Sequence, residues 1–287
     1  MRYTEYPANM HTHCYLDDGK EEMAAYVKRA LSLGFRTLGF SCHTPISNQE
    51  DSWRASREGI ETYFTEFRRL KELYGNEIEL YCGMELDYLD RDGELAGMEY
   101  IDRLDFTIAS VHGMFHEPTG RYLNVDGPVE EFELLLADNF GSDIETMVDT
   151  YFRLQADMIR KYSFDILAHC DLIRKRNTGN RYFDPEAGHY IQSAERVVAA
   201  VISCGVRIEI NTGGMARGVT SDPYPSEWIL QRIAAAGTPV VLSSDAHHPD
   251  KLDFFYAGSL ELMNRCGVRS AELLQNGHWE LLKSADA

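Results

Sequence analysis

The stretch Phe106-Thr107-Ile108-Ala109-Ser110-Val111-His112 is an apolar run of strand-forming residues that ends in a histidine. Other apolar runs along the chain also end in histidine or in an acidic residue. Their ends are His11-Thr12-His13, His43, Glu85, His169 and Asp245-Ala246-His247. In an α/β barrel the carboxyl ends of the strands converge on one face, where active sites lie. Imidazoles and carboxylates gathered there suit a transition metal, so the pattern predicts a metal-dependent hydrolase.

Segments with helical periodicity separate these runs. Strands are predicted near 5–11, 36–41, 78–85, 105–111, 164–169, 206–211 and 239–244. Helices are predicted at about 23–31, 56–75, 148–162, 185–204 and 228–236. Alternating β and α units imply a parallel sheet with right-handed crossovers. Because six strands end in chemically active residues, a closed or nearly closed barrel is favoured over an open sheet, whose ligand would lie at one switch point.

Residues 1–287 are expected to form a single domain, since no Gly/Ser-rich linker or low-complexity run divides the chain. The one long interruption of the α/β pattern is 113–144, which contains several turn residues and follows His112. Two interpretations of this segment stay open, a lid over the site or a surface excursion.

The formal net charge of -18 argues against a nucleic acid as the main partner, because backbone phosphates bind to a basic surface. A small anionic substrate is compatible with this charge, since bound divalent cations reverse the local field. No apolar run approaches the roughly 20 residues of a membrane span, and the first residues lack the apolar region of a signal peptide. We therefore expect a cytoplasmic protein that binds no membrane.

The six cysteines form no Cys-x-x-Cys pair, which argues against a zinc ribbon. Cys14, Cys42 and Cys170 each follow a candidate ligand histidine. Adjacent strand residues point to opposite faces, so we expect packing residues beside the site rather than metal ligands. The run from Cys170 to Arg176 has the spacing of a cysteine phosphatase, but it lacks the glycines that would wrap a phosphate.

Two pairs of candidate ligands have alternate spacing at a strand end. His11 and His13 lie on the same side of the chain and can bind one ion, and Asp245 with His247 repeats this spacing with a harder ligand. Asp18 follows in a loop, where it can ligate a metal or cap a helix, and Asp17 competes with it for this role. A single histidine is more often a hydrogen-bonded core residue than a ligand. Six of the ten histidines, however, fall at strand ends of one face, which favours a shared metal site.

These motifs resemble the polymerase-and-histidinol-phosphatase (PHP) superfamily of metal-dependent phosphoesterases, and within it the histidinol-phosphate phosphatase branch. The resemblance covers essentially the whole chain. The motifs are His11-Thr12-His13, Asp18-Gly19, Ser41-Cys42-His43, Gly83-Met84-Glu85, Ser110-Val111-His112, Ala168-His169-Cys170-Asp171, Glu209-Ile210-Asn211-Thr212-Gly213-Gly214 and Ser243-Ser244-Asp245-Ala246-His247. The resemblance implies a distorted (β/α)7 TIM-like barrel with a metal site at the carboxyl ends of its strands.

The resemblance also implies three divalent transition metals per chain, either Zn²⁺, Mn²⁺ or Fe²⁺. The first metal is expected on His11, His13, Glu85 and Asp245. The second is expected on Glu85, which bridges, with His112 and His169. The third is expected on Asp18, His43 and His247. A water shared by close metals supplies hydroxide near neutral pH, and the residues expected to be catalytic are Glu85, Asp245 and His247.

The implied reaction is hydrolysis of L-histidinol phosphate to L-histidinol and phosphate, a step of histidine biosynthesis. The alternative is a PHP-type phosphatase or phosphodiesterase that acts on a nucleotide or another small phosphate. Arg174 and Arg217 are expected to bind phosphate, because the arginine fork matches phosphate oxygens, and His248 is a further candidate for substrate contact. The proton donor stays open among His247, His248 and Asp171, and the sequence does not predict the oligomeric state.

Overall fold

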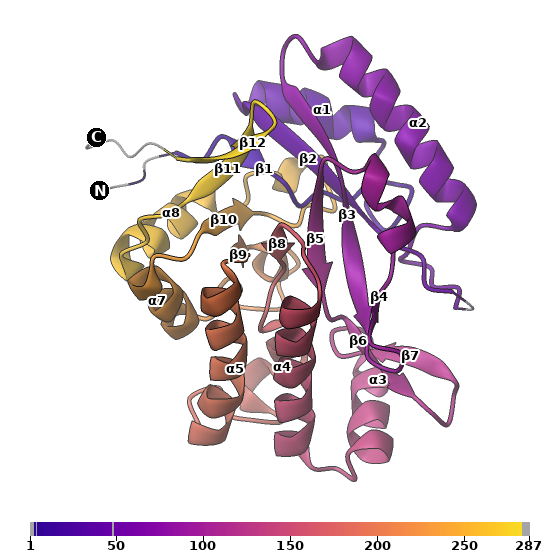
Figure 1. The fold of residues 1–287 in the computed structure, drawn as a ribbon, viewed down its shortest axis with the longest axis vertical. Coiled ribbons are helices and arrows are strands. Elements are labelled where there is room, and N and C mark those ends of the chain that lie inside the picture. The colour runs from indigo at the N-terminus through magenta and orange to yellow at the C-terminus, as the bar shows by residue number, and fades with distance from the viewer. Residues whose placement is uncertain (1–2, 4, 48, 283–287) are drawn as a thin grey trace.

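The central sheet of the computed structural model contains seven parallel strands whose spatial order follows the chain (Figure 1). The structure describes residues 3, 5–47 and 49–282. The parallel strands are β1 (Ala8–Asn9), β2 (Thr37–His43), β3 (Glu79–Leu89), β5 (Phe106–Ser110), β8 (Ile166–Leu167), β9 (Arg207–Asn211) and β10 (Val240–Ser243). All seven overlap the predicted ranges, so the apolar runs are confirmed as strands.

The chain segments that follow the first and last strands meet and close the barrel at its carboxyl end. Thr12 and Ala246 form a parallel bridge. The His13 amide donates to the Ala246 carbonyl at 2.9 Å, and the Ala246 amide donates to the His11 carbonyl at 3.1 Å. The expected barrel is therefore confirmed, and its closure lies beside the candidate ligands.

The longer helices pack against the outside of the barrel (Figure 1). They are α1 (Met23–Ser32), α2 (Arg57–Tyr74), α4 (Ile144–Lys161), α5 (Gly188–Cys204), α7 (Glu227–Ala236) and α8 (Tyr256–Cys266). At the start of α4, Asp143 Oδ1 accepts a hydrogen bond from the Thr146 amide at 3.1 Å. This cap satisfies an amide group that has no partner within the helix, and α4 begins one turn earlier than the apolar periodicity predicts.

The segment 113–144 is built from a hairpin and short helices. They are β6 (Gly113–His116), β7 (Arg121–Asn124), α3 (Val129–Leu134) and the π-helical turn η2 (Leu135–Asn139). The Val125 amide donates to the His112 carbonyl at 2.8 Å. This hydrogen bond holds the end of the hairpin beside the end of β5.

Short elements complete the two ends of the barrel. They are β4 (Glu94–Leu95), which pairs with β3, then η1 (Met98–Arg103), η3 (Leu172–Arg176), η4 (Thr178–Asn180), α6 (Gly213–Ala216) and η5 (Pro249–Lys251). A C-terminal hairpin of β11 (Glu272–Gln275) and β12 (His278–Leu281) is absent from the sequence prediction. Trp279 Nε1 donates to Asp165 Oδ1 at 3.0 Å, and Arg207 Nε donates to Glu272 Oε2 at 2.6 Å. Because Asp165 and Arg207 lie at the starts of β8 and β9, the hairpin covers the barrel end away from the candidate ligands.

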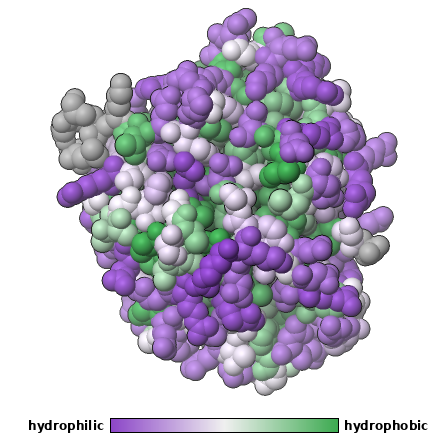
Figure 2. Space-filling model, in the orientation of Figure 1, coloured by the Kyte–Doolittle hydropathy of each residue, from purple (hydrophilic) through white to green (hydrophobic). Residues whose placement is uncertain are grey.

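The face shown in Figure 2 is mostly hydrophilic, with hydrophobic residues in separate small patches. This agrees with the large net charge. Among the described helices, none combines the length and apolar character needed to cross a membrane.

Candidate metal centre

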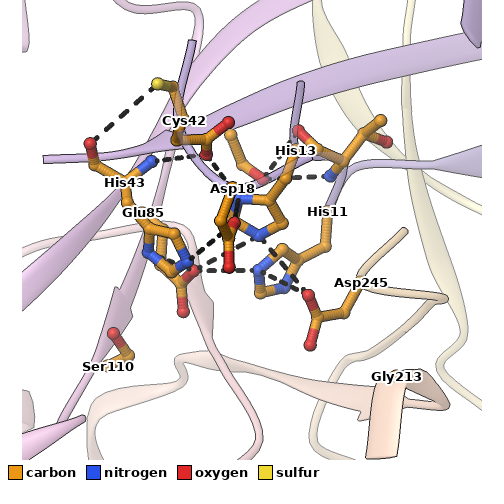
Figure 3. A network of polar contacts seen from close by, with 12 residues as sticks. His11, His13, Asp18, Cys42, His43, Glu85, Ser110, Gly213 and Asp245 are labelled. Atoms are coloured by element: carbon orange, nitrogen blue, oxygen red, sulfur yellow. Dashed lines mark hydrogen bonds and ion pairs between the residues drawn. The ribbon is translucent and has the colours of Figure 1, made fainter. Parts of the chain in front are cut away.

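Glu85 lies at the centre of the site and is completely buried. Its Oε2 atom lies 3.1 Å from His11 Nε2, 3.1 Å from His43 Nδ1 and 3.6 Å from His13 Nε2. Figure 3 shows these side chains converging from β2, β3 and the segment that follows β1. One carboxylate oxygen therefore faces three imidazole nitrogens at once.

The second oxygen of Glu85 faces a different pair of histidines. Oε1 lies 3.0 Å from His169 Nε2 and 3.4 Å from His112 Nε2. The two oxygens of one carboxylate thus divide five imidazoles into two groups. This arrangement is what a carboxylate that bridges two metal ions requires.

Asp18 and His247 form the outer part of the site. Asp18 Oδ1 lies 3.0 Å from His247 Nε2 and 3.9 Å from His43 Nε2. The ring centroid of His13 is 4.4 Å from that of His247 and 4.3 Å from that of His43. The structure therefore brings Asp18, His43 and His247 together, as the sequence predicts.

Asp245 joins the cluster from the loop after β10. Its Oδ1 lies 3.4 Å from His13 Nε2 and 3.8 Å from His11 Nε2. Its backbone has φ of +49°, in the left-handed region that aspartate tolerates better than most residues. A Cβ atom at Gly213 would lie 2.5 Å from Asp245 Oδ2 and 2.8 Å from Arg217 Nη2, so a side chain there would displace these two groups.

A second layer of carboxylates orients the rings from behind. Glu209 Oε1 lies 2.7 Å from His11 Nδ1, and Asp87 Oδ1 lies 2.7 Å from His112 Nδ1. Such partners fix the tautomer and the direction of a ligand ring. Neither Glu209 nor Asp87 is predicted from the sequence to have a role. The signal for Asp87 is its position two residues after Glu85, on the same face of β3.

Asp17 also belongs to this second layer. Its Oδ2 lies 2.7 Å from His13 Nδ1, and its Oδ1 accepts a hydrogen bond from the Cys14 amide at 2.8 Å. Asp17 therefore orients His13, whereas Asp18 faces the ligand cluster. Of the two aspartates, Asp18 is the one that faces the other candidate ligands.

The donor set fits divalent cations. The histidine and carboxylate atoms form four overlapping groups, and within each group all atoms lie within 4.8 Å of one another. Together the four groups contain all nine predicted ligands. Three buried atoms of the set, His13 Nε2, His43 Nδ1 and Asp18 Oδ1, lie near other candidate ligands but form no well-aligned hydrogen bond among the described residues. Leaving buried polar atoms without good hydrogen bonds is costly, and bound cations would give all three a partner. No cysteine sulfur belongs to these groups in the described chain, which agrees with the packing role expected for Cys14, Cys42 and Cys170.

The site lies at the end of a cavity of about 860 Å³. Its lining includes Glu85, His112, His169 and His247, and several positively charged side chains. The positively charged residues are Lys20, Arg121, Lys175, Arg176 and Arg217. The segment 113–144 supplies part of the wall through Arg121, Asn124, Asp126 and Glu131, so it is more than a surface excursion.

Comparison with protein families decides the identity of this arrangement. The model of the PHP domain matches residues 8–213, which is well over half of the chain. The chain belongs to the PHP domain family. The matched region contains the seven predicted ligands from His11 to His169, and Asp245 and His247 follow it.

Named relatives of this PHP domain extend over nearly the whole chain. A Schizosaccharomyces pombe protein named "Probable histidinol-phosphatase" is 25% identical over 94% of this chain and 90% of its own length. The histidinol-phosphatase of Bacillus subtilis is 25% identical over 88% of this chain and 97% of its own. The crystal structure of histidinol phosphate phosphatase from Lactococcus lactis, in complex with zinc, L-histidinol and phosphate, superposes with a TM-score of 0.70. It is 18% identical and covers 96% of this chain and 98% of that one, which shows a shared fold.

Arg174 does not line the cavity of this PHP domain. Its Nη1 donates to Asp222 Oδ2 at 2.8 Å, its Nη2 donates to the Pro223 carbonyl at 3.0 Å, and its Nε lies 2.8 Å from Asp171 Oδ2. The expectation that Arg174 binds phosphate therefore needs correction, because its guanidinium is already committed to these three partners. Its neighbours Lys175 and Arg176 face the cavity instead.

His248 and Asp171 also lie outside the cavity lining. The His248 side chain is half-buried, and its Nδ1 accepts a hydrogen bond from the Asp250 amide at 3.2 Å, which caps η5. Asp171 Oδ2 accepts from the Ser226 amide at 2.8 Å. Of the three candidates for the proton donor, His247 is the one that lines the cavity. Arg217 also lines it and donates from Nη2 to Asp245 Oδ2 at 2.8 Å.

Without metal, the carboxylates of the site hold protons on several rings. Burial alone would lower the pKa of His13 and of His112. Asp17 outweighs burial at His13 and raises its pKa to about 10, and Asp87 with Glu85 raises the pKa of His112 to about 9. His43 differs, because burial and the neighbouring His13 lower its pKa to about 3.

Binding of Zn²⁺ to this PHP domain is expected to release protons. His13 and His112 carry a proton at pH 7 in the metal-free protein, but a ligand imidazole must be neutral. We therefore expect release of more than one proton per chain at pH 7, and an apparent metal affinity that rises with pH up to the pKa of His13, about 10. Calorimetric titration of the metal-free protein in buffers of different ionisation enthalpy measures this release. Zn²⁺ binding at pH 7 without net proton release would contradict it.

Proposed function

We propose that this PHP domain hydrolyses L-histidinol phosphate to L-histidinol and phosphate in a metal-dependent reaction. The observation that carries the proposal is a cluster of nine candidate metal ligands, seven of which line one cavity together with several cationic side chains. The lysine and arginine side chains suit a phosphate group, and the candidate ligands suit the metals that activate water. The names of the relatives support this substrate, since both contain the word histidinol-phosphatase. Both relatives match nearly the whole chain.

Three divalent ions would be held by the nine ligands in the proposed site. The first set is His11, His13, Glu85 and Asp245, the second is Glu85, His112 and His169, and the third is Asp18, His43 and His247. The split between the two oxygens of Glu85 supports its bridging role between the first two sets. Zn²⁺, Mn²⁺ and Fe²⁺ all suit these nitrogen and oxygen ligands. When bound, such ions lower the pKa of water and neutralise charge on a phosphate ester.

Cationic side chains of the cavity would hold the phosphate oxygens. Arg217 reaches His247 Nδ1 with Nη1 at 3.1 Å, so its guanidinium lies directly beside two proposed ligands. Lys175 Nζ donates to Asp126 Oδ2 at 2.7 Å, and Arg176 Nη2 donates to the Asp126 carbonyl at 2.7 Å. Asp126 thus orients two further cations toward the same space. Fixed cations of this kind stabilise the charge that develops on phosphate oxygens.

His247 is the side chain best placed to meet the leaving oxygen. It lines the cavity and is about one-fifth exposed, whereas the other two candidates for the proton donor do not line it. Acidic side chains farther along the wall would face the positively charged part of histidinol phosphate. These residues are Glu50, Asp51 and Glu131.

A substrate panel tests the proposal. The metal-loaded protein would be assayed with L-histidinol phosphate, nucleotide monophosphates, cyclic nucleotides and sugar phosphates. We expect L-histidinol phosphate to have the highest kcat/KM. A preference for a nucleotide or a phosphodiester would overturn the substrate assignment and leave a PHP phosphoesterase of different specificity.

Arg217→Ala is expected to lower kcat/KM by about one to two orders of magnitude. Charge-assisted hydrogen bonds to phosphate are worth roughly 1.5–3 kcal/mol each, which corresponds to that range. Because Arg217 also contacts Asp245, bound metal must be measured in the same samples at saturating metal, where we expect full occupancy. Arg265→Ala is the matched control, since this arginine is exposed and paired with Glu227 on the outer helices. A normal kcat/KM for Arg217→Ala would show that this residue does not bind the phosphate.

A further inference from the structure

Arg54 is a buried arginine in the loop between β2 and α2, and only 3% of its side chain is exposed. Its Nη1 donates to the Thr44 carbonyl at 3.0 Å, and its Nε donates to Asp51 Oδ2 at 3.2 Å. The same Nη1 donates to Asp87 Oδ2. A buried cation with three oxygen partners is held in one orientation.

Asp87 connects Arg54 to a proposed metal ligand. Its Oδ2 takes the hydrogen bond from Arg54, and its Oδ1 lies 2.7 Å from His112 Nδ1. The two oxygens of this buried carboxylate are therefore shared between the arginine and the histidine. The direction of the His112 ring depends on where Arg54 holds Asp87.

Trp53 connects Arg54 to the same histidine from the cavity side. The guanidinium carbon of Arg54 lies 3.8 Å from the centroid of the Trp53 ring. That ring meets His43 at 4.7 Å and 88°, and His112 at 5.4 Å and 70°. Trp53 lines the cavity, so Arg54 supports both a wall of the cavity and the partner of a ligand.

The outer end of this network reaches the hairpin in 113–144. Asp51 Oδ1 accepts a hydrogen bond from Arg121 Nη2 at 3.2 Å, and Arg121 lies in β7. Arg54 and Arg121 thus share one carboxylate. The Arg54 guanidinium thus links three parts of the site, namely the β6–β7 hairpin, Trp53 in the cavity wall and His112.

We infer that Arg54 is a positioning residue that holds His112 for metal binding and Trp53 for the cavity wall at the same time. The inference rests on the proposed function, in which His112 is a metal ligand. An arginine is needed because its planar fork can stack on an aromatic ring while it donates to several oxygens. A lysine has one ammonium group and cannot make all of these contacts.

Zn²⁺ affinity is the measurement that tests this role. The metal-free full-length chain would be titrated with Zn²⁺ in competition with a chelator of known affinity, for the wild type, Arg54→Met, Arg54→Lys and His112→Ala. Loss of an outer partner of a ligand typically lowers metal affinity about 10- to 100-fold, and we expect this for Arg54→Met and a smaller loss for Arg54→Lys. Arg57→Met is the matched control, since Arg57 is exposed three residues later, and we expect wild-type affinity.

A double-mutant cycle separates positioning from a purely structural role. Arg54 and Asp87 act on His112 along one path. The double variant Arg54→Met with Asp87→Asn is therefore expected to lose no more Zn²⁺ affinity than whichever single variant binds Zn²⁺ more weakly. Wild-type Zn²⁺ affinity in Arg54→Met, or fully additive losses in the cycle, would overturn the inference. If Arg54→Met does not fold, Arg54→Lys decides it by the same criterion. Unchanged affinity in His112→Ala would instead overturn the ligand assignment, and the inference with it.

Discussion

Glu85→Gln is expected to weaken metal loading and phosphatase activity together. The substitution keeps the size of the side chain but removes its charge, and the amide nitrogen cannot act as a metal ligand. In the native protein, the two oxygens of Glu85 face separate groups of histidines at 3.0–3.6 Å. Loss of an outer partner of a metal ligand already costs about 10- to 100-fold, so loss of a bridging ligand should reduce activity by more than about 100-fold.

Elemental analysis and turnover of L-histidinol phosphate, measured on the same samples, check this expectation. Glu72→Gln is the control, since Glu72 is exposed on the outer helix α2 and lies away from the cavity lining. The control should keep both metal and activity. A Glu85→Gln variant with normal metal content and turnover would show that the bridge lies elsewhere.

Arg174→Ala is expected to reduce stability rather than phosphate binding. Arg174 is 89% buried and pairs with Asp171, which is completely buried. Burial lowers the pKa of Arg174, but Asp171 and Asp222 outweigh burial and keep the guanidinium charged. Removal of one partner of a buried ion pair leaves an uncompensated charge and typically costs about 3–5 kcal/mol. We expect a loss of that order in the free energy of unfolding.

Urea unfolding of the metal-free variants measures this loss directly. Arg181→Ala is the matched control, because this arginine is exposed and pairs with Glu133 at the surface. Arg176→Ala provides the contrast, since Arg176 lines the cavity and should lower kcat/KM with a smaller effect on stability. Wild-type stability together with a large loss of kcat/KM in Arg174→Ala would restore Arg174 as a phosphate ligand.

The barrel and its ligand cluster could be predicted from the sequence because both depend on local patterns. An apolar run followed by a histidine specifies a buried strand and the end at which its ligand lies. Since parallel strands share one direction, six such ends predict a shared site without knowledge of the strand order. Strands β1 and β8 are shorter than predicted, but the ligands that follow them still reach the cluster.

The residues that orient the ligand side chains from behind could not be predicted, because their roles depend on contacts between distant segments. Arg54 reaches Asp87 across 33 residues, and Glu209 reaches His11 across 198 residues. The direction of Arg174 depends on Asp171 and Asp222, so its neighbours face the cavity in its place. A loop arginine looks the same in sequence whether it faces an ion pair or a substrate.

The most direct test of the account follows L-histidinol phosphate turnover while metal is returned to the metal-free protein. Bound metal would be determined on the same samples by elemental analysis, with Zn²⁺, Mn²⁺ and Fe²⁺ in separate series. We expect no turnover in the metal-free protein, and activity that rises as more than one ion binds per chain. Full hydrolysis of L-histidinol phosphate by the metal-free protein would contradict the account.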